Sequence, residues 1–134
     1  MSVLELDRVS YRYPRGERPA LDEVTLELGA GELVVVAGGS GSGKSTLLRA
    51  ACGLVPHFHG GEFTGRALVA GMDTRDHGPG ELAAAVGTLF QDPESQVVMG
   101  SPRAELAFPL ENRGALPGEV ARGVEEPGLG TEPF

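Results

Sequence analysis

The sequence predicts an α/β protein in which a glycine-rich loop joins a buried strand to a helix, behind an antiparallel β subdomain. The apolar run 33–37 is followed at once by the glycine-rich run 38–46, and good helix formers come next. Ahead of them, residues 3–13 and 21–28 alternate apolar and polar side chains. Such alternation is typical of antiparallel strands with one face in water.

The first strands and the turns between them follow from this pattern. The segment Pro14-Arg15-Gly16-Glu17-Arg18-Pro19 separates the two alternating runs and reads as a turn. Gly29-Ala30-Gly31-Glu32 then directs the chain into the apolar run. Because Leu33-Val34-Val35-Val36-Ala37 is apolar throughout, we expect a short strand buried on both faces, as in a parallel sheet.

The run Gly38-Gly39-Ser40-Gly41-Ser42-Gly43-Lys44-Ser45-Thr46 fits the pattern G-x-x-x-x-G-K-[ST]. Its glycines allow successive backbone N–H groups to turn inward and form an anion-binding nest. Lys44 is the only lysine of the 134-residue chain, and a compact ammonium suits a tight loop better than an arginine fork. A flexible Gly/Ser loop is the plainer interpretation, and no G-x-G-x-x-G stands in register for a dinucleotide. The run therefore predicts a phosphate-binding loop.

The chemistry of this loop suits a triphosphate with a metal ion. Lys44 would neutralise the β- and γ-phosphates, and the Ser45 hydroxyl would bind Mg²⁺. The helix expected over 45–51 would add the positive end of its dipole and its free first-turn amides. We expect this helix to end near Gly53, ahead of Pro56.

Three short elements are expected after the helix. Residues 67–70 alternate like a strand, and an alanine-rich stretch from Pro79 or Gly80 to Val86 predicts a small helix. Thr88-Leu89-Phe90 reads as a brief strand that leads to Gln91.

Composition limits the possible partners and location. The formal net charge is −8, which argues against a nucleic-acid partner. No apolar stretch approaches the roughly 20 residues that would span a bilayer, and the first residues lack the pattern of a signal peptide. We therefore expect a cytoplasmic chain without a membrane span of its own. Cys52 is the only cysteine, so no internal disulfide is expected.

Three segments resemble the ATP-binding subunits of ABC transporters, most closely those of the energy-coupling-factor type that import vitamins, cobalt or nickel. These are the phosphate-binding loop, the segment Val9-Ser10-Tyr11-Arg12-Tyr13-Pro14, and Phe90-Gln91-Asp92-Pro93-Glu94-Ser95-Gln96-Val97-Val98, which is similar to the Q-loop of that subfamily. The resemblance covers about residues 3–113. It implies a P-loop ABC ATPase fold, with 1–113 as the N-terminal part of the domain and 114–134 as a divergent or frayed tail.

The resemblance also implies roles for single residues. Tyr13 would stack on adenine, and Gln91 would contact Mg²⁺ or the attacking water and report the nucleotide state to a transmembrane subunit. The phosphates would be bound by Gly38, Gly41, Gly43, Lys44, Ser45 and Thr46. An ordinary strand aromatic is the alternative for Tyr13, with Tyr11 on the same strand face as a competitor. A plain loop glutamine before a turn is the alternative for Gln91.

The chain departs from the family pattern in its catalytic parts. We find no acidic strand end for Mg²⁺, no serine-glycine signature and no switch histidine, so we expect the C-terminal catalytic half to be missing and stability in isolation to be marginal. Asp73 ends the apolar run 68–72, but a hairpin turn explains it better than a metal site. His57 and His59 make a poor closed metal site, and His77 reads as a solvated turn residue.

Two functions remain after this comparison of motifs. The first is a transport ATPase domain that binds ATP and Mg²⁺, dimerises head to tail with a second ATP-binding subunit, and drives solute import from the inner face of the membrane. The second is a nucleotide-binding fragment without hydrolysis. A small nucleotide kinase shares the loop, but the antiparallel pattern ahead of it and the lack of an arginine-rich lid count against that alternative.

Overall fold

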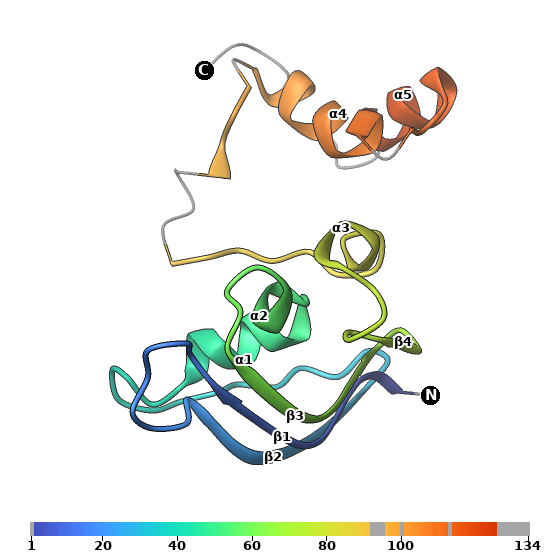
Figure 1. Cartoon of the computed structure of the whole chain (residues 1–134). Coiled ribbons are helices and arrows are strands. Elements are labelled where there is room, and N and C mark those ends of the chain that lie inside the picture. Colours follow the sequence, from blue (N-terminus) through green and yellow to red (C-terminus); the bar gives the residue numbers. More distant parts are fainter. Residues whose placement is uncertain (1, 92–95, 100, 113, 126–134) are drawn as a thin grey trace. The chain divides into compact units, whose positions relative to one another are not determined.

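The structure is a computed structural model that describes residues 2–91, 96–99, 101–112 and 114–125. The chain divides into two compact units, Met1–Thr88 and Leu89–Phe134, which are coloured from blue to red along the sequence in Figure 1. Each unit is described by itself.

The first unit is built on an antiparallel sheet with the strand order β2-β1-β3-β4. Leu6 in β1, one of the two inner strands, pairs with Leu26 on one side and Ala67 on the other. The strands predicted at 3–13 and 21–28 are thereby confirmed, and the one predicted at 67–70 begins earlier than expected. Their bounds are β1 (Ser2–Arg12), β2 (Leu21–Gly29), β3 (Glu62–Val69) and β4 (Met72–Asp73).

Two helices pack on one face of this sheet, as Figure 1 shows. Helix α1 (Lys44–Ala51) follows the glycine-rich loop, and the short α2 (Leu54–His57) comes after it. Gly53 between them has φ +76°, which confirms the predicted left-handed helix stop. The shared core joins strand and helix residues: Leu6, Val9, Tyr11, Leu21, Ala50, Val55 and Ala67.

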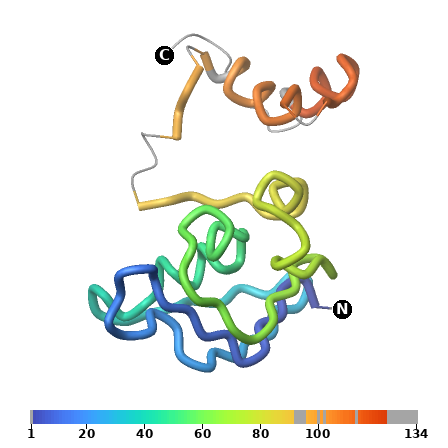
Figure 2. The backbone as a smooth tube through the Cα atoms, in the orientation of Figure 1, coloured from blue at the N-terminus to red at the C-terminus, as the bar shows by residue number. Residues whose placement is uncertain are grey.

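The prediction of a strand at residues 33–37 is wrong. The segment between Gly31 and Ser40 has no regular secondary structure, and Figure 2 shows it as the pale blue stretch of backbone that leads toward α1. Leu33 is 90% exposed and Val35 is 82% exposed. A strand needs a neighbour to satisfy its N–H and C=O groups, and no described strand pairs with this segment.

The elements predicted around residues 79–90 are only partly confirmed. Helix α3 (Pro79–Leu82) is shorter than the stretch expected to reach Val86, although Leu82 is fully buried. Residues 88–90 form no strand, and Leu89 is 74% exposed. As at residues 33–37, apolar sequence forms no strand where the described chain offers no pairing partner.

The second unit contains two helices that pack on each other, α4 (Pro102–Asn112) and α5 (Pro117–Glu125). Helix α4 continues through Pro109 rather than ending there. Gly114, with φ +76°, lies in the turn between the helices, and the N–H of Ala115 donates to the carbonyl of Leu110 at 3.0 Å. Of residues 114–134, expected as a divergent or frayed tail, Pro117–Glu125 form helix α5, and residues 126–134 lie outside the described residues.

Candidate phosphate-binding site

The glycine-rich run forms an exposed loop that ends on the first turn of α1. Gly41 and Gly43 have φ +79° and +99°, in the left-handed region where only glycine is unstrained. The N–H of Ser42 donates to the carbonyl of Gly39 at 3.2 Å, and that of Leu47 donates to Gly43 at 2.9 Å as the helix begins. The first-turn amides that precede Leu47 have no carbonyl one turn earlier in the helix to bind, which leaves them for an anion.

The side chain of Lys44 contacts the backbone of this loop. Its Nζ donates to the carbonyl oxygens of Gly38 at 2.6 Å and Gly39 at 2.7 Å, and lies 3.3 Å from Ser42 Oγ. All three contacts are to oxygen atoms of neutral groups, and none of them is to a carboxylate. Phosphate oxygens are stronger acceptors than these neutral groups and can replace them.

One glycine of the loop, Gly43, is required by a close contact with the backbone, and Gly38 lies close to a side chain that can rotate away. A Cβ atom on Gly38 would lie 2.6 Å from Ser42 Oγ, and one on Gly43 would lie 2.4 Å from the carbonyl oxygen of Ala20. Gly43 therefore brings the phosphate-binding loop against the segment that joins β1 to β2. By contrast, a Cβ atom on Gly39 would meet nothing within 4 Å.

The two hydroxyl residues after Lys44 differ in accessibility. Ser45 is exposed, as a residue that binds a solvated metal ion needs to be. Thr46 is only 6% exposed, and its Oγ1 lies 3.0 Å from the hydroxyl oxygen of Tyr13. The structure therefore joins the loop to Tyr13, a residue expected to belong to the same site.

The two tyrosines of β1 and its following turn are placed differently. Tyr11 is 1% exposed, donates its hydroxyl to the carbonyl of Gly60, and has a pKa raised above its usual value, mainly by burial. Tyr13 is only partly buried and contacts α1. Of the two residues, Tyr13 has the larger solvent-accessible surface.

Arg49 is a neighbour of the site that the sequence analysis missed. It lies on α1 and donates from Nη1 to the Tyr13 hydroxyl at 2.7 Å. Its position three residues after Thr46 places both side chains on one helix face. That spacing was visible in the sequence, but nothing there indicated that Tyr13 lay opposite.

Gln91 belongs to the second unit and is exposed. Residues 92–95 of the segment that resembles a Q-loop lie outside the described residues. In the described remainder, Gln96 Oε1 accepts the N–H of Phe90 at 3.0 Å. Glu105 Oε2 accepts the N–H groups of Val98 at 3.0 Å and Met99 at 2.7 Å. The role of Gln91 stays a prediction.

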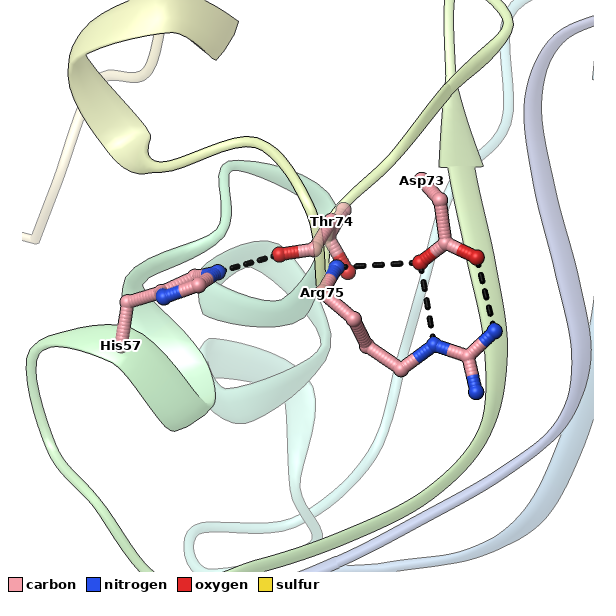
Figure 3. Close-up of polar contacts among 4 residues, drawn as sticks. All are labelled: His57, Asp73, Thr74 and Arg75. Atoms are coloured by element: carbon pink, nitrogen blue, oxygen red, sulfur yellow. Dashed lines mark hydrogen bonds and ion pairs between the residues drawn. The ribbon is translucent and has the colours of Figure 1, made fainter.

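The other polar residues weighed as metal ligands are bound to protein groups, as Figure 3 shows for His57 and Asp73. His57 Nε2 is hydrogen-bonded to the carbonyl of Thr74, and Asp73 pairs with Arg75 at 2.7 Å. The Arg75 hydrogen bond lowers the pKa of Asp73 to about 2. Within the described residues, no group of three or more His, Cys, Asp or Glu side chains is arranged to hold a metal ion.

The remaining histidines also have protein neighbours. The ring of His59 lies 5.9 Å from that of Tyr13 at an angle of 82°. His77 Nδ1 lies 2.8 Å from Glu81 Oε2, one turn along the chain. His77 is therefore better described as part of a polar pair at the start of α3 than as a purely solvated residue.

The chain belongs to the ABC transporter family, whose family model matches residues 21–110. A Streptomyces coelicolor protein named among ABC transporter ATP-binding proteins is 48% identical over 92% of this chain and 22% of its own length. A Pyrococcus horikoshii protein named in the same way is 41% identical over 92% of this chain and 44% of its own. The chain thus spans less than half the length of these relatives.

Solved structures confirm the predicted fold, an ABC ATPase fold with an N-terminal antiparallel sheet. A dimeric ATP-binding cassette in a post-hydrolysis state, bound to ADP and Pi, matches with TM-score 0.66 and 30% identity over 91% of this chain and 54% of that chain. A nucleotide-free ATP-binding cassette matches with TM-score 0.64 and 26% identity over 90% and 45%. Among the described residues, no helix is long and apolar enough to cross a membrane.

Proposed function

We propose that this chain binds ATP with Mg²⁺ as part of the nucleotide-binding subunit of an ABC transporter. The observation that carries the proposal is the position of Lys44, whose ammonium lies over the glycine loop on the carbonyls of Gly38 and Gly39 at the N-terminus of α1. The single lysine of the chain stands at a helix N-terminus, and its contacts with the described residues are to neutral oxygens, an arrangement suited to a polyphosphate.

The residues of the loop would divide the binding between them. Backbone N–H groups at Gly41 and Gly43 and in the first turn of α1 would donate to phosphate oxygens, while Lys44 would exchange its carbonyl contacts for phosphate contacts. The exposed Ser45 hydroxyl would hold Mg²⁺, which would neutralise charge on the phosphates. Phosphate binding by Gly38 and Thr46 belongs to the same proposal, for Thr46 through its backbone N–H, since its hydroxyl contacts Tyr13.

Two further residues would complete the nucleotide site. Tyr13 would stack on the adenine ring, which the part-buried position of its own ring beside α1 supports. Gln91 would contact Mg²⁺ or orient the attacking water through its uncharged amide. Its exposure leaves this amide accessible.

The transport function is proposed on the family membership and on the segment 90–98. In this proposal the chain couples ATP hydrolysis to solute import of the energy-coupling-factor type. It acts at the cytoplasmic face of the membrane with a transmembrane subunit and a second ATP-binding subunit, head to tail. Among relatives, one cassette is dimeric and one solved structure is a bacterial Atm1-family exporter with ATP bound. Co-purification with an energy-coupling-factor transmembrane subunit, and not with an exporter subunit, is the expected result.

Binding of a fluorescent ATP analogue with Mg²⁺ tests the nucleotide site. The Lys44→Ala substitution removes an ammonium that makes charge-assisted contacts, so we expect affinity to fall by roughly 10- to 100-fold. Arg122→Ala removes one positive charge from an exposed side chain of α5 and should leave affinity unchanged. Equal affinity of the Lys44→Ala variant and the unsubstituted chain would contradict the proposed site.

Release of inorganic phosphate in the same samples separates the two functions. Steady release that Lys44→Ala abolishes would support hydrolysis by this chain. Binding without release would favour the alternative, a nucleotide-binding fragment without hydrolytic activity. One observation favours that alternative. The carboxylate of Asp73, which could have replaced the missing acidic metal ligand, is paired with Arg75.

A further inference from the structure

Three side chains link the base side of the proposed site to its phosphate side. Arg49 Nη1 donates to the Tyr13 hydroxyl at 2.7 Å, and that hydroxyl lies 3.0 Å from Thr46 Oγ1. Because the Tyr13 oxygen accepts from Arg49, its proton is free to point toward Thr46. We call these three residues the hydroxyl relay.

The relay crosses between segments that are distant in sequence. Tyr13 follows β1, whereas Thr46 and Arg49 lie on α1. Thr46 is 6% exposed and comes two residues after Lys44, so a contact with its side chain is a contact with the first turn of the phosphate-binding helix. The close approach of Gly43 to the Ala20 carbonyl joins the same two segments a second time.

The side-chain partner of Arg49 is a hydroxyl group and not a carboxylate. Among the described residues, no carboxylate forms an ion pair with Arg49, and its hydrogen bond goes to a neutral phenol. An arginine that served only solubility would leave its guanidinium in water. Here the guanidinium fixes the hydroxyl end of one aromatic ring.

The rest of the Tyr13 ring is fixed as well. The Tyr11 ring lies 4.9 Å away at an interplanar angle of 80°, and the His59 ring lies 5.9 Å away at 82°. These two rings fix the plane of the Tyr13 ring. The hydrogen bonds of the relay fix the position of its hydroxyl group beside α1. A stacking ring that is held in place before the ligand arrives loses less entropy on binding.

We propose that the hydroxyl relay positions the Tyr13 ring relative to the phosphate-binding helix and thereby sets how strongly the site prefers a nucleoside triphosphate over a bare polyphosphate. Arg49 is the positioning residue and does not contact the ligand. This inference rests on the proposed ATP-binding function. It adds a reason why the base and the phosphates are recognised together.

The test compares two ligands, ATP and inorganic tripolyphosphate, each with Mg²⁺, in competition with a fluorescent ATP analogue. We expect Arg49→Ala and Tyr13→Phe each to weaken ATP binding by about 3- to 10-fold, the range of one hydrogen bond. Tripolyphosphate binding should change by less than about 2-fold. Both substitutions remove the same hydrogen bond between Arg49 and Tyr13. The ATP affinity of the double variant should therefore be no lower than that of the single variant with the lower affinity.

Controls separate positioning from folding. Tyr13→Phe keeps the ring and its packing, Arg49→Lys keeps a cationic donor and should recover part of the ATP affinity, and Arg122→Ala removes an exposed charge elsewhere. An equal loss of affinity for ATP and tripolyphosphate, or an unchanged ATP affinity in Arg49→Ala, would contradict the proposed role of the hydroxyl relay. Neither result would contradict the proposed ATP binding. Failure of the unsubstituted, folded chain to bind either ligand would overturn the proposed function together with the relay.

Discussion

Strand β1 alternates apolar and polar residues and the segment 33–37 is apolar throughout, yet only β1 forms a strand. In β1, Leu6 is 2% exposed and pairs with strands on both sides. In the second segment, Leu33 is 90% exposed and its neighbours form no strand. The difference shows that β propensity becomes a strand only where a partner and a covering layer are available.

The comparison matters because the phosphate-binding loop lies directly after the unpaired segment. The loop is nevertheless ordered by its own contacts with α1 and with Ala20. The glycine geometry of the site therefore depends on the helix side and on the antiparallel sheet more than on the strand that was expected to precede it.

The largest effect should come from truncating equivalent leucines in the two regions. Leu6→Ala opens a cavity in the core and should lower the free energy of unfolding by roughly 2–5 kcal/mol. Leu33→Ala removes an exposed side chain and should change it by less than about 0.5 kcal/mol. Urea unfolding of both variants measures the difference. A large loss in Leu33→Ala would mean that residues 33–37 are packed in solution.

The next effect concerns two glycines of the loop. Gly43→Ala forces an L-residue to φ +99° and against the Ala20 carbonyl, and should destabilise the chain by about 1–3 kcal/mol and impair nucleotide binding. Gly39→Ala is the matched control, because its Cβ meets nothing within 4 Å. Thermal melting and nucleotide titration report the two consequences. Equal behaviour of the two variants would break the claim that the loop is fixed against the β1–β2 connection.

The smallest effect is electrostatic and lies at the end of the β3–β4 hairpin. The pKa of Asp73 is lowered from 3.8 to about 2, mainly by its hydrogen bond with Arg75. A lowered folded-state pKa means that this contribution to stability is complete above about pH 4 and disappears as the pH falls toward about 2. Since Arg75 is 51% exposed, the contribution should be less than about 1 kcal/mol.

Asp73→Asn should therefore lower stability slightly at neutral pH and reduce the loss seen between about pH 4 and pH 2. Acid titration followed by circular dichroism measures both. An unchanged acid profile in Asp73→Asn would show that the pair with Arg75 does not form in solution.

The sequence predicted the parts of the fold that depend on neighbouring residues. Alternation located β1 and β2, and the G-x-x-x-x-G-K-[ST] pattern located the loop and the start of α1, because these features are set by local chemistry. The predictions of strands at 33–37 and 88–90 were wrong, because strand pairing depends on distant residues that a local pattern does not contain. Tyr13 was selected by resemblance, and the structure adds that Tyr11 is buried.

The sequence predicted which residues form the loop of the site, but it did not predict the side-chain contacts around Tyr13. Lys44 and its glycines followed from their order in the sequence. The contact of Arg49 and Thr46 with Tyr13 joins residues 36 and 33 positions apart, and no periodicity relates positions that distant. Only the packing of α1 on the sheet brings them together.

Hydrogen exchange with and without ATP and Mg²⁺ tests the central claim most directly, since it reports both the paired strands and the loop in one experiment. We predict that β1 and β3 amides are protected in the free chain, that amides of 33–37 exchange rapidly, and that nucleotide adds protection at 39–46 without altering β1. At the same nucleotide concentration, the Lys44→Ala variant should show much less added protection. Loop amides that exchange at the same rate with and without nucleotide in the unsubstituted chain would contradict the account.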